Sequence, residues 1–310
     1  MQYNSAIDLI GNTPLLKLNR VFKQEQANVY VKLEMFNAAG SVKDRVALRM
    51  IEAAEQSGEL KPGQTILECT SGNTGVGLAM VGALKGYPVI IVMSKKASRE
   101  RQQLISAYGG QVILSSSPGG IAEDVDRYRQ IAKDKGYFFM SQFWNRENPR
   151  SHYESTGPEI VKDLGQAPDA LFAGVGTGGT LTGTGSYLKE CNPSCQVYAI
   201  EPSEAAVLLG GEDGEHQISG IGVSILPGIL DQSLIDKELT VNSETAIDWV
   251  KRLAQEEGLF LGASSAAAIA AVNQVIDQFE SDQNLVVICP DSGERYLSME
   301  LLPNHVMDDQ

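Results

Sequence analysis

The chain contains few of the side chains that build metal centres. Its 310 residues include only three histidines, His152, His216 and His305, which form no cluster in the sequence. The four cysteines include one close pair, Cys191 and Cys195, and lack the second pair that a zinc site would need. We therefore expect no bound metal and no histidine-based catalytic triad.

Basic charge is also scarce, with 25 Lys and Arg against 39 Asp and Glu and a net charge of −14. Nucleic-acid binding depends on basic residues that neutralise phosphates, so this composition argues against it. No apolar run reaches the ~18 residues of a membrane span. The first residues, MQYNS, lack the basic and then apolar stretch of a secretory signal. We expect a cytoplasmic protein that binds neither nucleic acid nor membrane.

Strand-like and helix-like segments alternate along the chain, and the length favours two domains that share a cleft. Strands are predicted at 29–33, 65–69, 89–93, 112–115, 170–173, 197–201 and 285–289. Helices are predicted at 41–57 with Ser41 as N-cap, from the turn 70–75 to about 85, from about 98, and at 121–135, 155–164, 180–189, 243–257 and 264–279. The glycine-rich stretch 210–222 is expected to be a mobile loop. Such alternation predicts an α/β fold with parallel sheets and ligands at the carboxyl ends of the strands.

A glycine-rich loop, GVGTGGT at residues 174–180, lies between a predicted strand and a predicted helix. It satisfies the G-x-G-x-x-G pattern, and Glu201 ends the next strand, as in dinucleotide-binding proteins. The loop suits other phosphates equally well, because its backbone N–H groups and the helix N-terminus attract any anion. Thr177 and Thr180 add hydroxyl donors that suit a terminal phosphomonoester. The loop alone allows three interpretations: a dinucleotide site, a site for another phosphate ligand, or a purely structural turn.

A lysine stands at a predicted helix start in residues 40–45, GSVKDR. Lys43 could be an ordinary surface lysine of an amphipathic helix. Its surroundings favour another role, because the small residues 37–41 leave room for a ligand. The helix dipole would lower the pKa of Lys43 and favour the neutral amine that forms imines. An imine-forming amine together with a phosphate site indicates pyridoxal phosphate.

A second polar turn, TSGNTG at residues 70–75, joins a strand to a helix. It could be an ordinary loop in which Ser71 or Thr74 caps the helix. Four side-chain donors in six positions exceed what a cap needs, so we favour a clamp for a substrate carboxylate.

These motifs resemble those of the cysteine synthases, or O-acetylserine sulfhydrylases, which are fold-type II pyridoxal-phosphate enzymes. The resemblance covers essentially the whole chain and rests on residues 10–15, 40–45, 70–75, 141–143, 156–160, 174–180, 220–222 and 292–298. It implies a tryptophan synthase β-like fold of two domains, each with a twisted, mainly parallel sheet flanked by helices. Residues 40–150 would form a smaller, mobile, substrate-clamping domain. Residues 1–39 and 151–310 would form a larger domain that binds the cofactor phosphate.

The resemblance also implies roles for individual residues. Lys43 would form the imine with pyridoxal 5′-phosphate and act as the general base, Asn73 would bond the cofactor's 3′ oxygen, and Ser264 would face its pyridine nitrogen. The phosphate would bind Gly176, Thr177, Gly178, Gly179 and Thr180. The substrate would bind Thr70, Ser71, Thr74, Gln142 and Gly220.

The implied reaction is a β-replacement that makes L-cysteine from O-acetyl-L-serine and sulfide or thiosulfate through an α-aminoacrylate. Alternatives are a phosphoserine-dependent cysteine synthase, a cystathionine- or lanthionine-forming β-synthase, a sulfide-releasing cysteine lyase, or a regulator without turnover. Phosphoserine-using relatives carry an arginine near the position of Gly220 that meets the substrate phosphate. This chain has no arginine between residues 190 and 237, so the resemblance favours acetylserine over phosphoserine. Asp231 and Asp291 could activate water in a lyase, although we favour them as surface loop residues.

Finer assignments rest on shorter segments. LPGI at 226–229 is similar to the B isozyme, whereas GIG at 220–222 is similar to the A isozyme, and we favour the B type. The resemblance implies a homodimer, and a contact with serine acetyltransferase is not established.

Overall fold

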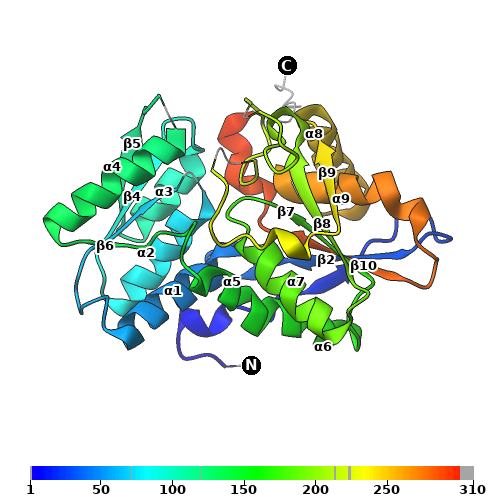
Figure 1. Cartoon of the computed structure of the whole chain (residues 1–310), viewed down its shortest axis with the longest axis horizontal. Coiled ribbons are helices and arrows are strands. Elements are labelled where there is room, and N and C mark those ends of the chain that lie inside the picture. Colours follow the sequence, from blue (N-terminus) through cyan, green and yellow to red (C-terminus); the bar gives the residue numbers. More distant parts are fainter. Residues whose placement is uncertain (1, 71, 119, 213, 223–224, 301–310) are drawn as a thin grey trace, which may run out of the picture.

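The computed structural model describes residues 2–300 except 71, 119, 213, 223 and 224. It contains two sheets that lie side by side, with helices on both faces of each (Figure 1). In the described part of the chain all strand pairs are parallel except one, so the predicted α/β fold with parallel sheets is confirmed.

The larger sheet has six strands in the order β1-β2-β10-β7-β8-β9. Its strands are β1 (Leu15–Lys17), β2 (Asn28–Leu33), β7 (Ala170–Gly174), β8 (Gln196–Pro202), β9 (Lys237–Val241) and β10 (Asn284–Cys289). Only β1 runs antiparallel to its neighbour. The central position of β10, between β2 and β7, brings together both ends of the described chain.

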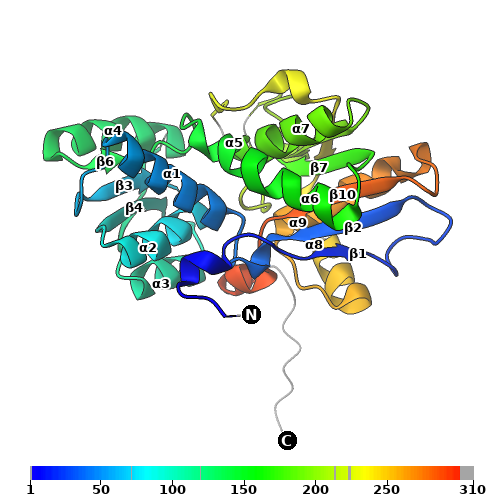
Figure 2. The same cartoon turned by 90° about the horizontal axis from the view of Figure 1, so that it is seen from below.

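Helices cover both faces of this sheet (Figure 2). They are α6 (Gly157–Leu164) and α7 (Gly179–Cys191) on one face, and α8 (Ser243–Arg252) and α9 (Ala263–Val275) on the other. Side chains alternate along β7, so Phe172 packs in the core with α9 while Leu171 and Ala173 pack in the core with α7. This alternation is typical of a strand that is buried on both faces.

The smaller sheet has four parallel strands in the order β5-β4-β3-β6. Its strands are β3 (Ile66–Cys69), β4 (Val89–Ser94), β5 (Gln111–Ser115) and β6 (Phe138–Phe139). Its helices are α1 (Lys43–Ser57), α2 (Asn73–Lys85), α3 (Arg99–Ala107) and α4 (Gly120–Lys135). Ile66 packs with α1 and α2, whereas Leu67 packs with α4.

A helical segment with a π turn follows the smaller sheet. It consists of α5 (Glu147–Ser151), a π turn at His152–Thr156 and then α6, where a single helix at 155–164 was predicted. A second π turn, Leu253–Glu257, continues α8. Short 3-10 turns lie at Ala6–Leu9, Glu34–Phe36, Ser203–Ala205, Gln232–Leu234, Ile276–Gln278 and Gly293–Met299.

The start of α1 and the stretch 210–222 can be compared directly with the predictions. α1 begins at Lys43 with Val42 as its N-cap, one residue after the predicted cap Ser41. The Ser41 hydroxyl still accepts the Lys43 N–H at 3.3 Å, and Ser41 also forms a β-bridge with Asp291. The described residues of 210–222 form neither helix nor strand.

In the described part of the chain, no helix is long and apolar enough to cross a membrane.

Candidate active site

A cavity of about 300 Å³ opens where strands of both sheets end. The turn after β3 contributes Thr70, the loop after β7 contributes Thr177, and Pro290 follows β10. The first turn of α1 adds Lys43. The carboxyl ends of parallel strands therefore surround this cavity, as the alternating pattern predicts.

Most of the residues singled out in the sequence meet in this cavity. It is lined by Lys43, Thr70, Asn73, Thr74, Gln142, Gly176, Thr177, Gly178, Thr180, Gly220 and Ser264. Gly179 is not among the lining residues and instead begins α7. Ser71 lies outside the described residues.

Lys43 is half-buried at the start of α1. Burial lowers the pKa of its ammonium group to about 8, and the negative charges of Asp291 and Glu34 oppose this shift. Among the described residues, none forms a hydrogen bond or ion pair with its Nζ atom. The sequence predicted a lowered pKa from the helix dipole, whereas burial is the larger cause in the structure. A lysine that is partly neutral near physiological pH suits imine formation and proton transfer.

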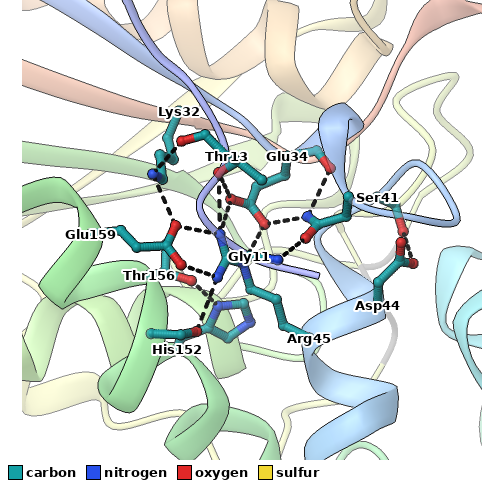
Figure 3. A network of polar contacts seen from close by, with 12 residues as sticks. Gly11, Thr13, Lys32, Glu34, Ser41, Asp44, Arg45, His152, Thr156 and Glu159 are labelled. Atoms are coloured by element: carbon teal, nitrogen blue, oxygen red, sulfur yellow. Dashed lines mark hydrogen bonds and ion pairs between the residues drawn. The ribbon is translucent and has the colours of Figure 1, made fainter. Parts of the chain in front are cut away.

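The two residues after Lys43 hold the start of α1 in place. Asp44 accepts a hydrogen bond from the Ala39 N–H at 2.6 Å. Arg45 lies at the centre of a buried network with Glu34, at 2.7 Å, and Glu159, at 2.6 Å (Figure 3). Glu34 follows β2 and Glu159 belongs to α6, so this network ties α1 to elements around the larger sheet.

The loop after β7 forms a cradle at the N-terminus of α7. A Cβ atom at Gly176 would overlap the carbonyl oxygen of Gly220, and Gly178 has φ +79°. Thr177 accepts a hydrogen bond from Asn148 Nδ2 at 3.1 Å, which leaves its hydroxyl hydrogen to donate. Thr180 lies 3.2 Å from His152 Nε2, and burial lowers the pKa of this imidazole well below its ordinary value. Hydroxyls, backbone N–H groups and a helix N-terminus thus converge as in an anion site.

The predicted clamp residues contact one another across the smaller sheet's edge. Thr74 Oγ1 donates to Gln142 Oε1 at 2.6 Å. The Gln142 N–H donates to Glu68 Oε2 at 2.9 Å, and Gln142 Nε2 donates to the Cys69 carbonyl. Burial raises the pKa of Glu68 to about 7 despite these backbone bonds. The geometry places hydroxyl and amide groups together beside Lys43.

Asp291 is fully buried, so its interpretation as a surface loop residue is wrong. Its Oδ2 atom accepts hydrogen bonds from Asn73 Nδ2 and from the Tyr296 hydroxyl, both at 2.6 Å. Asp231, in contrast, is an exposed loop residue that bonds the Ser233 N–H and hydroxyl. Neither aspartate lines the cavity.

Glu201 does not face the cavity, which weakens the dinucleotide interpretation. It is buried in β8, where Oε2 accepts the Leu208 N–H at 2.9 Å. A dinucleotide site would need this carboxylate to face a ribose.

Arg101 and Tyr296 also line the cavity, although the sequence analysis gave neither of them a role. The Arg101 guanidinium stacks on the Tyr296 ring at 4.4 Å and donates to Ser219 Oγ at 3.0 Å. The loop beside Gly220 therefore meets an arginine from α3, although it carries none itself. No local pattern marks Arg101, because its helix is short and mostly polar.

The chain is similar in sequence to known enzymes over nearly its whole length. Residues 6–291 match the model of the family "Pyridoxal-phosphate dependent enzyme". A cysteine synthase from Staphylococcus aureus (strain N315) is 44% identical over 299 residues, which is 96% of each chain. The chain belongs to the cysteine synthase family of pyridoxal-phosphate dependent enzymes.

Solved structures of related enzymes have the same fold as this chain. O-ureido-L-serine synthase has a TM-score of 0.93 and 43% identity, covering 100% of this chain and 98% of that one. A hydrogen sulfide-producing enzyme from Fusobacterium nucleatum has a TM-score of 0.91 and 40% identity, covering 95% of this chain and 100% of that one. The fold-type II architecture expected from the resemblance is confirmed.

The cofactor of this cysteine synthase family member is pyridoxal phosphate, and the cavity fits it. The glycine loop before α7 combines backbone N–H groups and a helix N-terminus, which fit an anion such as the cofactor phosphate, and the half-buried amine of Lys43 lines the same cavity. Ser264 lines the same cavity from the first turn of α9. Within the described ranges, no group of three His, Cys, Asp or Glu side chains could hold a metal ion.

Proposed function

We propose that the protein makes L-cysteine from O-acetyl-L-serine by β-replacement. The acetoxy group would leave the Cβ atom as acetate, and sulfide, or alternatively thiosulfate, would take its place. One observation carries this proposal. A lysine whose pKa is lowered to about 8 shares a cavity with a phosphate cradle and a polar clamp. The similarity to a cysteine synthase from Staphylococcus aureus, at 44% identity, supports cysteine as the product.

Pyridoxal phosphate supplies an electron sink for carbon–hydrogen and carbon–oxygen cleavage at the amino acid. Lys43 would hold the cofactor and, once released, take the proton from the substrate Cα atom and return it at the end. A pKa of about 8 suits both directions of this transfer near neutral pH.

Ser264 and Asn73 would set the character of the cofactor ring. Both line the cavity, Ser264 from α9 and Asn73 from α2. A hydroxyl beside the pyridine nitrogen leaves that nitrogen uncharged, whereas a carboxylate would keep it protonated. This choice favours loss of a β-leaving group over transamination.

Thr70, Thr74 and Gln142 would hold the substrate carboxylate, with Gly220 opposite them and Ser71 as a further donor. Thr74 and Gln142 hydrogen-bond each other at 2.6 Å, and this proximity supports a joint role at one carboxylate. We also propose that residues 40–150 move as a substrate-clamping domain against the rest of the chain, which would exclude water from the cavity.

Acetylserine fits the cavity better than phosphoserine. Arg101 is the cation beside Ser219, and its guanidinium is already engaged by Ser219, by the Tyr296 ring and by Asp291 at 3.9 Å. A phosphate at the substrate side chain would have to compete with these partners, whereas a neutral acetyl group would not.

We further propose that the protein is a homodimer, that it is the B isozyme, and that it is located in the cytoplasm. The free thiols of Cys69, Cys195 and Cys289 are buried, which suits a reducing compartment. Light scattering at several protein concentrations tests the dimer, and thiosulfate turnover tests the isozyme.

Product analysis tests the proposed reaction. The purified protein is offered acetylserine, phosphoserine, serine or cysteine, each with sulfide, thiosulfate or homocysteine. We expect cysteine and acetate from acetylserine and sulfide, no product with Lys43→Ala, and full activity with the exposed-lysine control Lys61→Ala. Serine and sulfide from cysteine, with no synthesis from acetylserine, would instead establish the lyase.

A further inference from the structure

Asp291 follows β10 and is buried directly behind the residues that line the cavity. The neighbouring residue Pro290 lines the cavity, and Ser41 forms a β-bridge with Asp291 just before Lys43. The Asp291 side chain receives the Asn73 amide and the Tyr296 hydroxyl on the same oxygen, Oδ2. A carboxylate in this position can orient Asn73 without touching the ligand.

The Asn73 carboxamide lies between two charged groups. Its Nδ2 donates to Asp291, and its Oδ1 accepts from Arg295 Nη1 at 2.9 Å. Arg295 is itself anchored on the Ala39 carbonyl. A flipped amide would place its oxygen against a carboxylate and its NH₂ against a guanidinium, so only one orientation is stable. One of the two Nδ2 hydrogens remains available after the bond to Asp291.

We propose that Asp291 and Arg295 are positioning residues that lock the Asn73 carboxamide, so that it meets the cofactor ring as a hydrogen-bond donor. The inference rests on the proposed function, because it requires pyridoxal phosphate in this cavity with its ring oxygen beside Asn73. It extends the function to two residues that lie behind the cavity wall.

A cationic side chain and a helix N-terminus lie close to the Asp291 side chain. Arg101 Nη2 lies 3.9 Å from Oδ2, and the charge of Asp291 also raises the pKa of Lys43 against the effect of burial. The other oxygen, Oδ1, has no hydrogen-bond partner among the described residues. It approaches Gly262 so closely that a Cβ atom there would overlap it, at the N-terminus of α9. A helix N-terminus stabilises a negative charge.

The holoenzyme and the Asp291→Asn variant test the proposal through the bound cofactor itself. We expect the absorption maximum to shift by several nanometres and the cofactor dissociation constant to rise about tenfold, because a bond to a charged group is lost. Glu294→Gln, an exposed carboxylate three residues away, is the matched control and should change neither quantity. An Asp291→Asn protein with the wild-type spectrum and affinity would overturn the proposal.

A double-mutant cycle separates positioning from a general structural effect. In an Asn73→Ser background, Asp291→Asn should no longer shift the absorption maximum, because no amide remains to orient. An equal shift in both backgrounds would contradict the proposal. If Asp291→Asn does not fold by circular dichroism, Arg295→Lys is carried through the same cycle with the same expected outcomes. A wild-type protein that captures no cofactor would instead refute the proposed function.

Discussion

At the scale of single residues, the position of Lys43 controls its chemistry. The amine is half-buried, and its pKa is lowered to about 8. Because only the neutral amine attacks an aldehyde, cofactor capture by the apoprotein should accelerate as pH rises through this value. We expect the rate to increase about tenfold between pH 7 and pH 9 and then level off.

Stopped-flow absorbance after mixing apoprotein with pyridoxal phosphate measures this rate. Lys43→Ala should bind the cofactor without forming the coloured imine, whereas Lys61→Ala should follow the wild-type profile. A rate that still climbs steeply above pH 10 would show that the Lys43 pKa is unshifted.

The sequence predicts the cavity-lining residues well where the chemistry is local. Lys43 and Asn73 stand in short motifs that follow strands, and both reach the cavity. Asp291 and Arg101 could not be assigned in this way. Asp291 bonds Asn73 across 218 positions, and its burial depends on that distant contact rather than on its neighbours.

At the scale of elements, α1 depends on Arg45. This guanidinium is buried between the carboxylates of Glu34 and Glu159 and also bonds Thr13. Arg45→Met would leave two carboxylates facing an apolar side chain. We expect the free energy of unfolding to fall by about 3–5 kcal/mol, with a lower kcat because Lys43 belongs to the same helical turn.

Urea unfolding measures the loss, and an exposed pair supplies the control. Arg150 forms an i,i+4 ion pair with Glu154 at 2.6 Å on the surface. Arg150→Met should leave the unfolding midpoint unchanged, because exposed ion pairs contribute little. Equal midpoints for both variants would show that the buried network does not hold α1.

Long elements follow from periodicity, whereas short ones do not. The pattern locates β3 within one residue and the end of α2 at residue 85, but it misses β1, β6 and β9. β6 has two residues and β1 has three, so their pairing partners decide their conformation. The π turn at His152–Thr156 is equally invisible, because side-chain packing rather than composition sets it.

At the scale of the whole molecule, buried carboxylates link stability to pH. Burial raises the pKa of Glu68 to about 7, so between its ordinary value of 4.5 and this value the folded state holds a proton that the unfolded state has lost. The contribution of Glu68 to stability is therefore present at low pH and is lost as pH rises through about 7. Glu68→Gln should remove this dependence, a difference of up to about 3 kcal/mol between pH 5 and pH 8.

Parallel urea titrations of the wild type and Glu68→Gln at several pH values test this dependence. The difference between the two proteins should grow in favour of the variant as pH rises. Glu59→Gln, which changes an exposed carboxylate, should run parallel to the wild type. A constant difference between wild type and Glu68→Gln would show that Glu68 ionises normally in the folded protein.

The central place of β10 in the larger sheet has a consequence for synthesis on the ribosome. β2 is made early and β7 midway, yet the strand that joins them, residues 284–289, emerges only near the end of the described chain. The smaller sheet uses only residues 66–139 and can assemble while translation continues. Until β10 arrives, β2 and β7 each expose an open edge that invites wrong pairing. The nascent protein therefore needs protection longest around β2, the earlier of these two strands.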